Sequence, residues 1–207
     1  MEELIGFIPP ITKVIAGGAL LISTLCSLNF IEAHDLFFDM SLILEKHEYW
    51  RVFTTFLYFG SFGIGTFIHL FALFQNSKML EVMMFQGQLA EFLYFIILSC
   101  SIMLLIAPTF NLYFLSESLF MCITYLLSKK NREARVALIG LPINIPYTFL
   151  PYIFLMFGTE KTKIIGMIIA HVYYYLEDVL PMLPTTKNFR LLRPPSVIRY
   201  LAERVEQ

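Results

Sequence analysis

Apolar residues form six long runs along the chain, and short polar segments separate them. A helix that spans a membrane needs roughly 20 mostly apolar residues. The six runs occupy residues 11–30, 52–74, 89–107, 110–127, 136–157 and 163–180. Pro108 should end the third helix, and three prolines in the fifth run predict kinks. The pattern predicts an all-α, polytopic membrane protein with six transmembrane helices.

The composition agrees with a membrane location. Of the 207 residues, 57% are apolar and only 15% are charged, whereas soluble domains are about 45–50% apolar and about a quarter charged. The net charge of −1 provides no basic surface for phosphates, which excludes a nucleic-acid-binding protein. Cys26, Cys100 and Cys122 lie inside apolar runs without metal-binding spacing, so we expect no metal and no other cofactor.

Lysine and arginine are distributed unequally between the two sides of the predicted bundle. If the N-terminus is cytosolic, eleven of them face the cytosol and four face the other side. Positive charge is enriched in cytosolic loops, so we expect both termini in the cytosol. The cytosolic set is Lys13, Lys78, Lys129, Lys130, Arg132, Arg135, Lys187, Arg190, Arg193, Arg199 and Arg204, and the opposite set is Lys46, Arg51, Lys161 and Lys163. We divide the chain into a membrane domain, residues 1–183, and a short cytosolic tail, residues 184–207.

The longest segment between predicted spans, residues 31–49, mixes apolar residues with acidic ones. Such a mixture is typical of a segment at the membrane interface, although an ordinary solvated loop would also fit. Trp50 and Arg51 follow it directly. We expect Arg51 to find a phosphate or carboxylate partner near the membrane surface. The pair is a candidate functional motif, and a simple aromatic-belt anchor is the alternative.

Ionisable residues within a span are costly in lipid, so each is a candidate functional residue. Ser116 and Glu117 lie in the fourth run, His171 lies in the sixth, and Glu177 with Asp178 closes the sixth. Ser116 and His171 could be the nucleophile and base of an intramembrane protease, and Glu117 with His171 could form the proton relay of a transporter. We favour hydrogen bonding and packing between helices, with Glu177 and Asp178 as interfacial charges.

Gly166 and Ala170 precede His171 with a small-xxx-small spacing. Small residues four positions apart lie on one helix face and let a second helix approach closely. The spacing predicts close packing of the sixth helix against a neighbour.

Several motifs resemble those of the derlin family and occur in that family's order over almost the whole chain. Trp50-Arg51, followed by Phe56-Leu57-Tyr58-Phe59-Gly60, is similar to the start of the family's second helix. The run from His171 to Val179, followed by Pro181, resembles its sixth helix. The other matching motifs are Leu80-Glu81, Lys129-Lys130-Asn131, Leu150-Pro151-Tyr152 and Pro194-Pro195.

This resemblance implies a rhomboid-like fold without the protease's catalytic site, and a multi-pass protein of the endoplasmic reticulum membrane. It implies a non-enzymatic role in endoplasmic-reticulum-associated degradation, in which misfolded lumenal and membrane proteins are returned to the cytosol. The implied partners are those substrates, a membrane ubiquitin ligase complex, the bilayer and a cytosolic AAA ATPase. The chain has no glycine after Gly166, so the family's Gly-rich tail motif for recruiting that ATPase is absent.

Two further departures from the family patterns concern the candidate site. The family's Gly-x-x-x-Gly is Gly166-x-x-x-Ala170 here, which keeps both residues small. The active rhomboid motif Gly-x-Ser-Gly is replaced by Phe114-Leu115-Ser116-Glu117, so both glycines are missing. We therefore assign no catalytic residue and expect no enzyme, and an active rhomboid-type intramembrane serine protease is the alternative.

Overall fold

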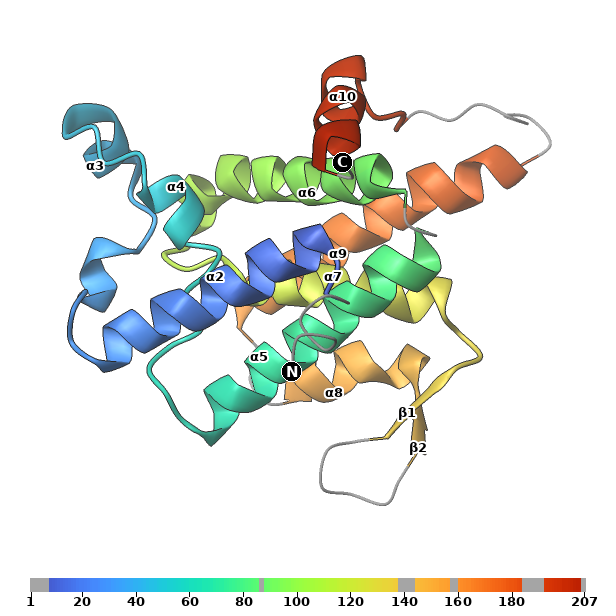
Figure 1. Cartoon of the computed structure of the whole chain (residues 1–207), viewed down its shortest axis with the longest axis horizontal. Coiled ribbons are helices and arrows are strands. Elements are labelled where there is room, and N and C mark those ends of the chain that lie inside the picture. The colour runs from blue at the N-terminus through green and yellow to red at the C-terminus, as the bar shows by residue number, and fades with distance from the viewer. Residues whose placement is uncertain (1–7, 86–87, 138–143, 157–159, 184–191, 206–207) are drawn as a thin grey trace.

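The protein is described by a computed structural model that covers residues 8–85, 88–137, 144–156, 160–183 and 192–205. Among these described residues, six helical segments form the bundle (Figure 1). Their intrahelical hydrogen bonds satisfy the backbone as lipid requires. In chain order the segments are α2 (Pro10–Ser27), α5 (Ile64–Met79) with the π-turn η2 (Leu80–Met84), α6 (Leu89–Phe110), α7 (Ser116–Lys130), α8 (Leu150–Met156) and α9 (Lys161–Tyr174) with η4 (Tyr175–Val179) and η5 (Leu180–Met182).

Three of these segments are long and apolar enough to cross a membrane by themselves. They are Pro10–Ser27, Leu89–Phe110 and Lys161–Met182, among the residues that the structure describes. The described chain is therefore helical with little strand, and the predicted all-α class is confirmed.

The expected second span is displaced along the chain. It was predicted at 52–74, but the helix begins at Ile64 and continues to Met84. A turn occupies the residues before Ile64 because Gly60 has a φ of +98°, a conformation that L side chains rarely adopt. Hydrogen bonds from Phe62 N to Ser27 Oγ and from Ser116 Oγ to Tyr58 O fix this turn.

The third to fifth spans also differ from prediction. Pro108 does not end the third helix, which continues to Phe110 and stops where Asn111 adopts the left-handed conformation. The fourth begins at Ser116 rather than 110. The range 136–157 is not one helix: β1 (Arg135–Ala137) pairs with β2 (Asn144–Pro146), and η3 (Tyr147–Phe149) then leads into α8. Pro146 favours this extended start because proline cannot donate within a helix. Pro142 and Phe157 lie outside the described residues.

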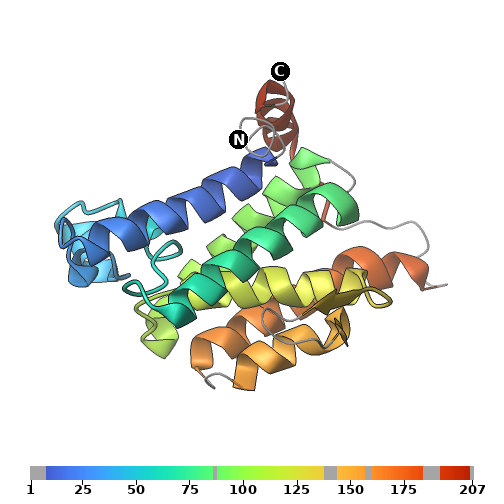
Figure 2. The ribbon, with the colours of Figure 1, turned by 60° about the horizontal axis from the view of Figure 1, so that its bottom comes forward.

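Helix α7 lies at the centre of the molecule. In Figure 2 it lies between α5 on one side and α8 with α9 on the other, and α2 covers the far side of α5. Nearly every side chain of α7 from Ser116 to Ser128 is buried. A helix enclosed by protein can carry serine and threonine side chains because its neighbours, rather than lipid, surround them.

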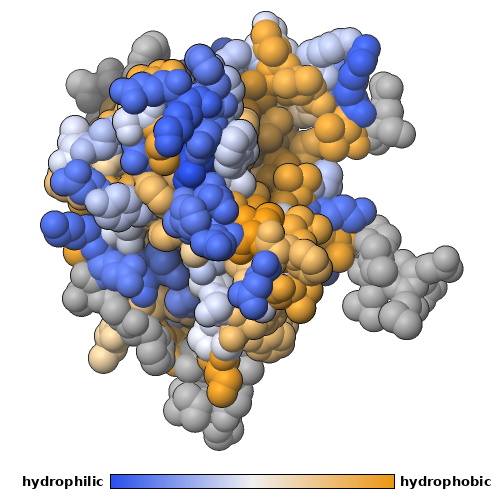
Figure 3. All heavy atoms as spheres, turned by 90° about the vertical axis from the view of Figure 1, so that its left-hand side faces the viewer, coloured by the Kyte–Doolittle hydropathy of each residue, from blue (hydrophilic) through white to orange (hydrophobic). Residues whose placement is uncertain are grey.

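The two ends of the bundle differ in chemistry. The first, called the loop end, contains η1 (Ala33–Asp35), α3 (Met40–Glu45), α4 (Arg51–Thr54) and residues 111–115. Figure 3 looks onto it and shows hydrophilic residues gathered over much of the face. Asp39 caps α3, and hydrogen bonds from Ser41 hold the pKa of the Asp39 carboxyl below its ordinary value.

The second end, called the basic end, contains the start of α2, η2, η4 and the end of α7 with Lys129 and Lys130. Glu81 of η2 accepts hydrogen bonds from Ile11 N (3.1 Å) and Thr12 N (2.8 Å), which satisfies donors at the start of α2. Lys130 lies over the ring of Phe85, with 5.2 Å between Nζ and the centroid. These contacts join the start of α2 to η2, and the end of α7 to Phe85, the residue after η2.

Candidate functional site: the seam between α7 and α9

Helices α7 and α9 lie side by side and run in the same direction. Three contacts along their length establish this, because the residue numbers of the paired side chains increase on both helices from one contact to the next. The contacts are Ser118 Oγ to Thr162 O (2.7 Å), Tyr125 OH to His171 Nδ1 (2.8 Å) and Lys130 Nζ to Asp178 Oδ1 (2.8 Å). The chain returns through α8 between these two helices, so the fourth and sixth predicted spans lie together and parallel.

Gly166 and Ala170 lie on the face of α9 that contacts α7. A Cβ atom built on Gly166 would lie 2.0 Å from Ser118 O, far inside van der Waals contact. Ala170, one turn further on, is completely buried. The backbones approach this closely because Gly166 has no side chain, in accordance with the predicted small-xxx-small packing.

Ser116 and His171 are not paired in this arrangement. Ser116 Oγ donates to Tyr58 O at 2.6 Å, and His171 is hydrogen-bonded to Tyr125. From 116 to 125 is nine residues, or about 13 Å along the axis of α7 at 1.5 Å per residue. Each side chain therefore makes a separate interhelical hydrogen bond, and the seam contains no contact between this serine and this histidine.

Glu117 joins a cluster of ionisable groups that sequence reasoning did not assemble. Its Oε1 lies 3.0 Å from His69 Nδ1 on α5, and its Oε2 lies 3.8 Å from Lys163 Nζ on α9. The Lys163 side chain is 4% exposed, and those of His69 and Glu117 are 19% exposed. Phe120 and Phe154 pack against the His69 ring, with centroids 5.3 and 5.8 Å away. We name His69, Glu117 and Lys163 the ion cluster.

A signal for the ion cluster was present in the sequence. His69 lies within the apolar run that forms α5, and an ionisable residue within a span usually has an ionisable or polar partner. Lys163 was counted only as a charge at a helix end. Its partner could not be named because the pairing joins three helices that are distant in the sequence.

Arg51 and Trp50 lie at the loop end, away from the contact between Lys130 and Asp178. The buried Arg51 guanidinium pairs with Glu48, so the expected carboxylate partner is three residues before it. It also donates to His34 O (2.8 Å) and Phe37 O (3.1 Å) and lies 4.9 Å from the centroid of the Phe37 ring. Trp50 is half exposed, and its Nε1 donates to Asp35 O. Arg51 therefore holds the segment 31–49 in place from one point.

The remaining candidates, Glu177 and Asp178, lie in the π-turn at the other end of α9. Asp178 pairs with Lys130, and both residues are partly exposed. Within the described ranges no group of three or more His, Cys, Asp and Glu side chains could hold a metal ion.

Comparison with known proteins identifies relatives over the full set of helices. The model of the Der1-like family matches residues 8–196. The chain is 30% identical to a probable derlin-2 homolog of Dictyostelium discoideum, covering 97% of this chain and 82% of that protein. It is 32% identical to Derlin-2.1 of Zea mays and 30% identical to Derlin-2.2 of Arabidopsis thaliana, with 97% of this chain covered in each case and 86% and 87% of the relative.

These matches confirm the resemblance on which the sequence interpretation relied. The family is polytopic with a rhomboid-like fold, so that part of the predicted fold class is confirmed too. Because its family model covers residues 8–196, this chain belongs to the Der1-like family, the derlins, multi-pass proteins of the endoplasmic reticulum membrane with a role in endoplasmic-reticulum-associated degradation.

Proposed function

We propose that this protein is a non-enzymatic component that helps misfolded lumenal and membrane proteins pass back through the endoplasmic reticulum membrane to the cytosol. Family membership supports the pathway. The observation that carries the mechanism is the height of the helices around the ion cluster. Among the described residues, the outer apolar segment Tyr147–Met156 has ten residues, which is about 15 Å, against about 30 Å for the hydrocarbon core.

The short side of the bundle favours local thinning of the bilayer. Within the described part of the chain this segment lies beside α5 and α7, whereas α6 has 22 residues and about 33 Å. A bilayer in contact with short apolar segments thins, or polar groups and water enter at its edge. The ion cluster between α5, α7 and α9 adds charge at that position. Both effects lower the barrier for a polar polypeptide.

The separation of Ser116 from His171 supports the non-enzymatic assignment. A serine protease needs a hydrogen-bonded base at its nucleophile and donors for the oxyanion. The alternative function is an intramembrane serine protease of rhomboid type. An activity-based fluorophosphonate probe tests it: we expect equal background labelling of wild type and Ser116→Ala. Labelling of wild type that disappears in Ser116→Ala would establish the protease instead.

We further propose that both termini and the tail are cytosolic, with residues 1–183 forming the membrane domain. The partners would be misfolded substrates, a membrane ubiquitin ligase complex and a cytosolic AAA ATPase. Two exposed regions can take an inserted glycosylation acceptor: residues 44–47, which we expect in the lumen, and the region around Glu133, which we expect in the cytosol. Acceptors inserted at 44–47 should be glycosylated in microsomes. Glycosylation near Glu133 would overturn the orientation.

The direct test is the half-life of a misfolded lumenal glycoprotein in cells that lack this protein. We expect slow clearance, restored by the wild-type chain. A chain with Trp50→Ala and Arg51→Ala should fail to restore it while accumulating to the normal level. Ser116→Ala should restore it. Normal clearance in the cells that lack the protein would contradict the proposed function.

A further inference from the structure

The last described helix, α10 (Ser196–Val205), is amphipathic and packs across α6. Ala202 is 3% exposed and belongs to the hydrophobic core. Figure 1 shows α10 crossing α6 rather than running along it. The match to the Der1-like family model ends at residue 196, the first residue of α10.

One apolar edge of α10 is not covered by the rest of the molecule. Val197, Leu201 and Val205 are 66%, 48% and 56% exposed. Residues four positions apart lie on one side of a helix, so these three form a continuous stripe beside the face that Ala202 anchors. A water-soluble helix of this length would place polar residues there, because exposed aliphatic side chains in contact with water are unfavourable.

The position of α10 in the bundle indicates what covers the stripe. Helix α6 has 22 mostly apolar residues and is long enough to span the membrane. Because α10 packs at a large angle to α6, α10 lies near the membrane plane. Figure 2 places α10 beside the beginning of α2, which belongs to the basic end. A lipid-facing surface already exists on α6, where Ile97 and Leu105 are exposed. Because α10 packs on α6, the stripe lies on a helix beside a membrane span that lipid surrounds.

The polar residues of α10 are arranged as an interface requires. At about 100° per residue, Arg204 and Tyr200 lie beside the stripe, whereas Arg199 and Glu203 lie away from it. The Arg204 guanidinium is 5.1 Å from the centroid of the Tyr200 ring. Tyrosine and arginine side by side are typical of the headgroup level, where the ring meets the acyl boundary and the guanidinium meets phosphate.

We propose that α10 is an interfacial helix that binds the anionic lipid surface of the membrane. Val197, Leu201 and Val205 enter the acyl boundary, and Arg204 binds lipid phosphate beside Tyr200. Ala202 fixes the helix to α6, so that lipid binding and the position of a membrane span are connected. Interfacial helices combine apolar contact with attraction to anionic lipid in this way.

The test uses the full chain with Cys26, Cys100 and Cys122 replaced by alanine, reconstituted in phosphatidylserine–phosphatidylcholine vesicles. A fluorophore is attached at Leu201→Cys on the stripe. The matched control carries it at Glu203→Cys, on the opposite side of the helix. Nitroxide on a shallow acyl position should quench the probe at 201 several-fold more than the probe at 203. Aqueous iodide should show the opposite order. Arg204→Glu should weaken the acyl quenching at 201, and so should pure phosphatidylcholine.

Two outcomes would overturn the proposal. Equal iodide access at both positions in the vesicles would show a water-exposed helix. Access at 201 in vesicles combined with protection in native microsomes would show that a protein, rather than lipid, covers the stripe. An unchanged thermal unfolding midpoint in detergent serves as the folding control for every variant.

Discussion

Gly166 is the residue at which the smallest chemical change should have the largest effect. Adding one methyl group places a carbon 2.0 Å from Ser118 O, and a backbone atom cannot move aside as a side chain can. Gly166→Ala should lower the free energy of unfolding by about 3 kcal/mol or more, at the upper end of overpacking effects. Thermal unfolding in detergent measures it. Gly17→Ala is the matched control, because a Cβ there meets nothing within 4 Å.

Gly17→Ala should be neutral or slightly stabilising, since alanine favours a helix by about 1 kcal/mol over glycine. Equal midpoints for the two variants would show that the α7 and α9 backbones do not pack in direct contact at Gly166.

Arg51 should be sensitive to replacement by another cation. Lysine keeps the charge but cannot reach His34 O, Phe37 O and Glu48 together, because it lacks the planar fork of the guanidinium. Arg51→Lys should therefore increase amide hydrogen exchange in residues 31–49, by an amount equivalent to about 1.5–3 kcal/mol for hydrogen bonds to a charged group.

Exchange in α6 should stay unchanged in Arg51→Lys. The control is Lys46→Ala, which removes an exposed cation from the same segment. If both variants exchange like wild type, Arg51 does not organise this segment and an anchoring role at the membrane surface becomes the better interpretation.

At the scale of elements, helix α2 depends on η2, which lies some 70 residues away in the sequence. The Glu81 carboxylate accepts hydrogen bonds from Ile11 N, Thr12 N and Thr12 Oγ1, the last at 2.7 Å. An acidic group at a helix start satisfies free amides and interacts favourably with the helix dipole. Glu81→Gln should destabilise the protein by about 1–2 kcal/mol and loosen the first turn of α2.

Amide exchange at residues 11–14 measures that loosening. Glu133→Gln, at an exposed site, removes the same charge without a cap and serves as the control. Unchanged exchange in Glu81→Gln would show that neutral hydrogen bonding alone is sufficient there.

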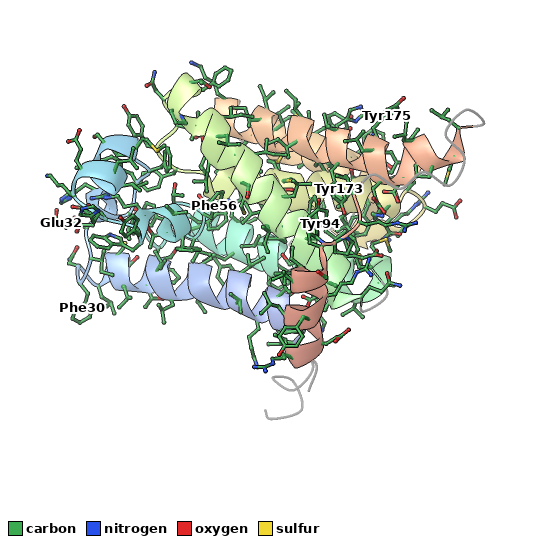
Figure 4. The ribbon with its side chains drawn as sticks, turned by 90° about the horizontal axis from the view of Figure 1, so that it is seen from above. Phe30, Glu32, Phe56, Tyr94, Tyr173 and Tyr175 are labelled. Atoms are coloured by element: carbon green, nitrogen blue, oxygen red, sulfur yellow. The ribbon has the colours of Figure 1, made fainter. Side chains whose placement is uncertain are left out.

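The packing between elements also explains the position of Tyr173. The centroid of its ring lies 4.7 Å from the centroid of the Phe95 ring, so α6 and α9 meet through two aromatic side chains. Figure 4 shows Tyr173 between these helices, whereas Tyr175 points away from the bundle. Two residues of the same type have different roles because the helix turns by about 200° between them.

At the scale of the whole molecule, the unequal helix heights predict a preference for thin bilayers. Among the described residues, the outer apolar segment Tyr147–Met156 has ten residues, fewer than a full span needs. Reconstituted in phosphatidylcholines of increasing acyl length, the protein should have its highest unfolding temperature in a bilayer thinner than the about 27 Å core of the endoplasmic reticulum. An optimum at or above that thickness would contradict local thinning.

The sequence by itself determined the helical class, the membrane location, the family resemblance and the close approach at Gly166 and Ala170. Hydrophobic run length and small-residue spacing are local properties, and lipid allows few alternatives to a helix. Helix boundaries were less accessible. The turn at Gly60 lies inside the mostly apolar run 52–74, and the strands Arg135–Ala137 and Asn144–Pro146 overlap the mostly apolar run 136–157.

Only the tertiary structure decided which polar groups meet. Ser116 and His171 appear as a dyad in the sequence, but each bonds to a different neighbour, Tyr58 and Tyr125. The ion cluster and the Glu81 cap join residues from different helices. Such pairings depend on the rotation and offset of packed helices, and the three-dimensional arrangement fixes these where the spacing of residues along the chain leaves them open.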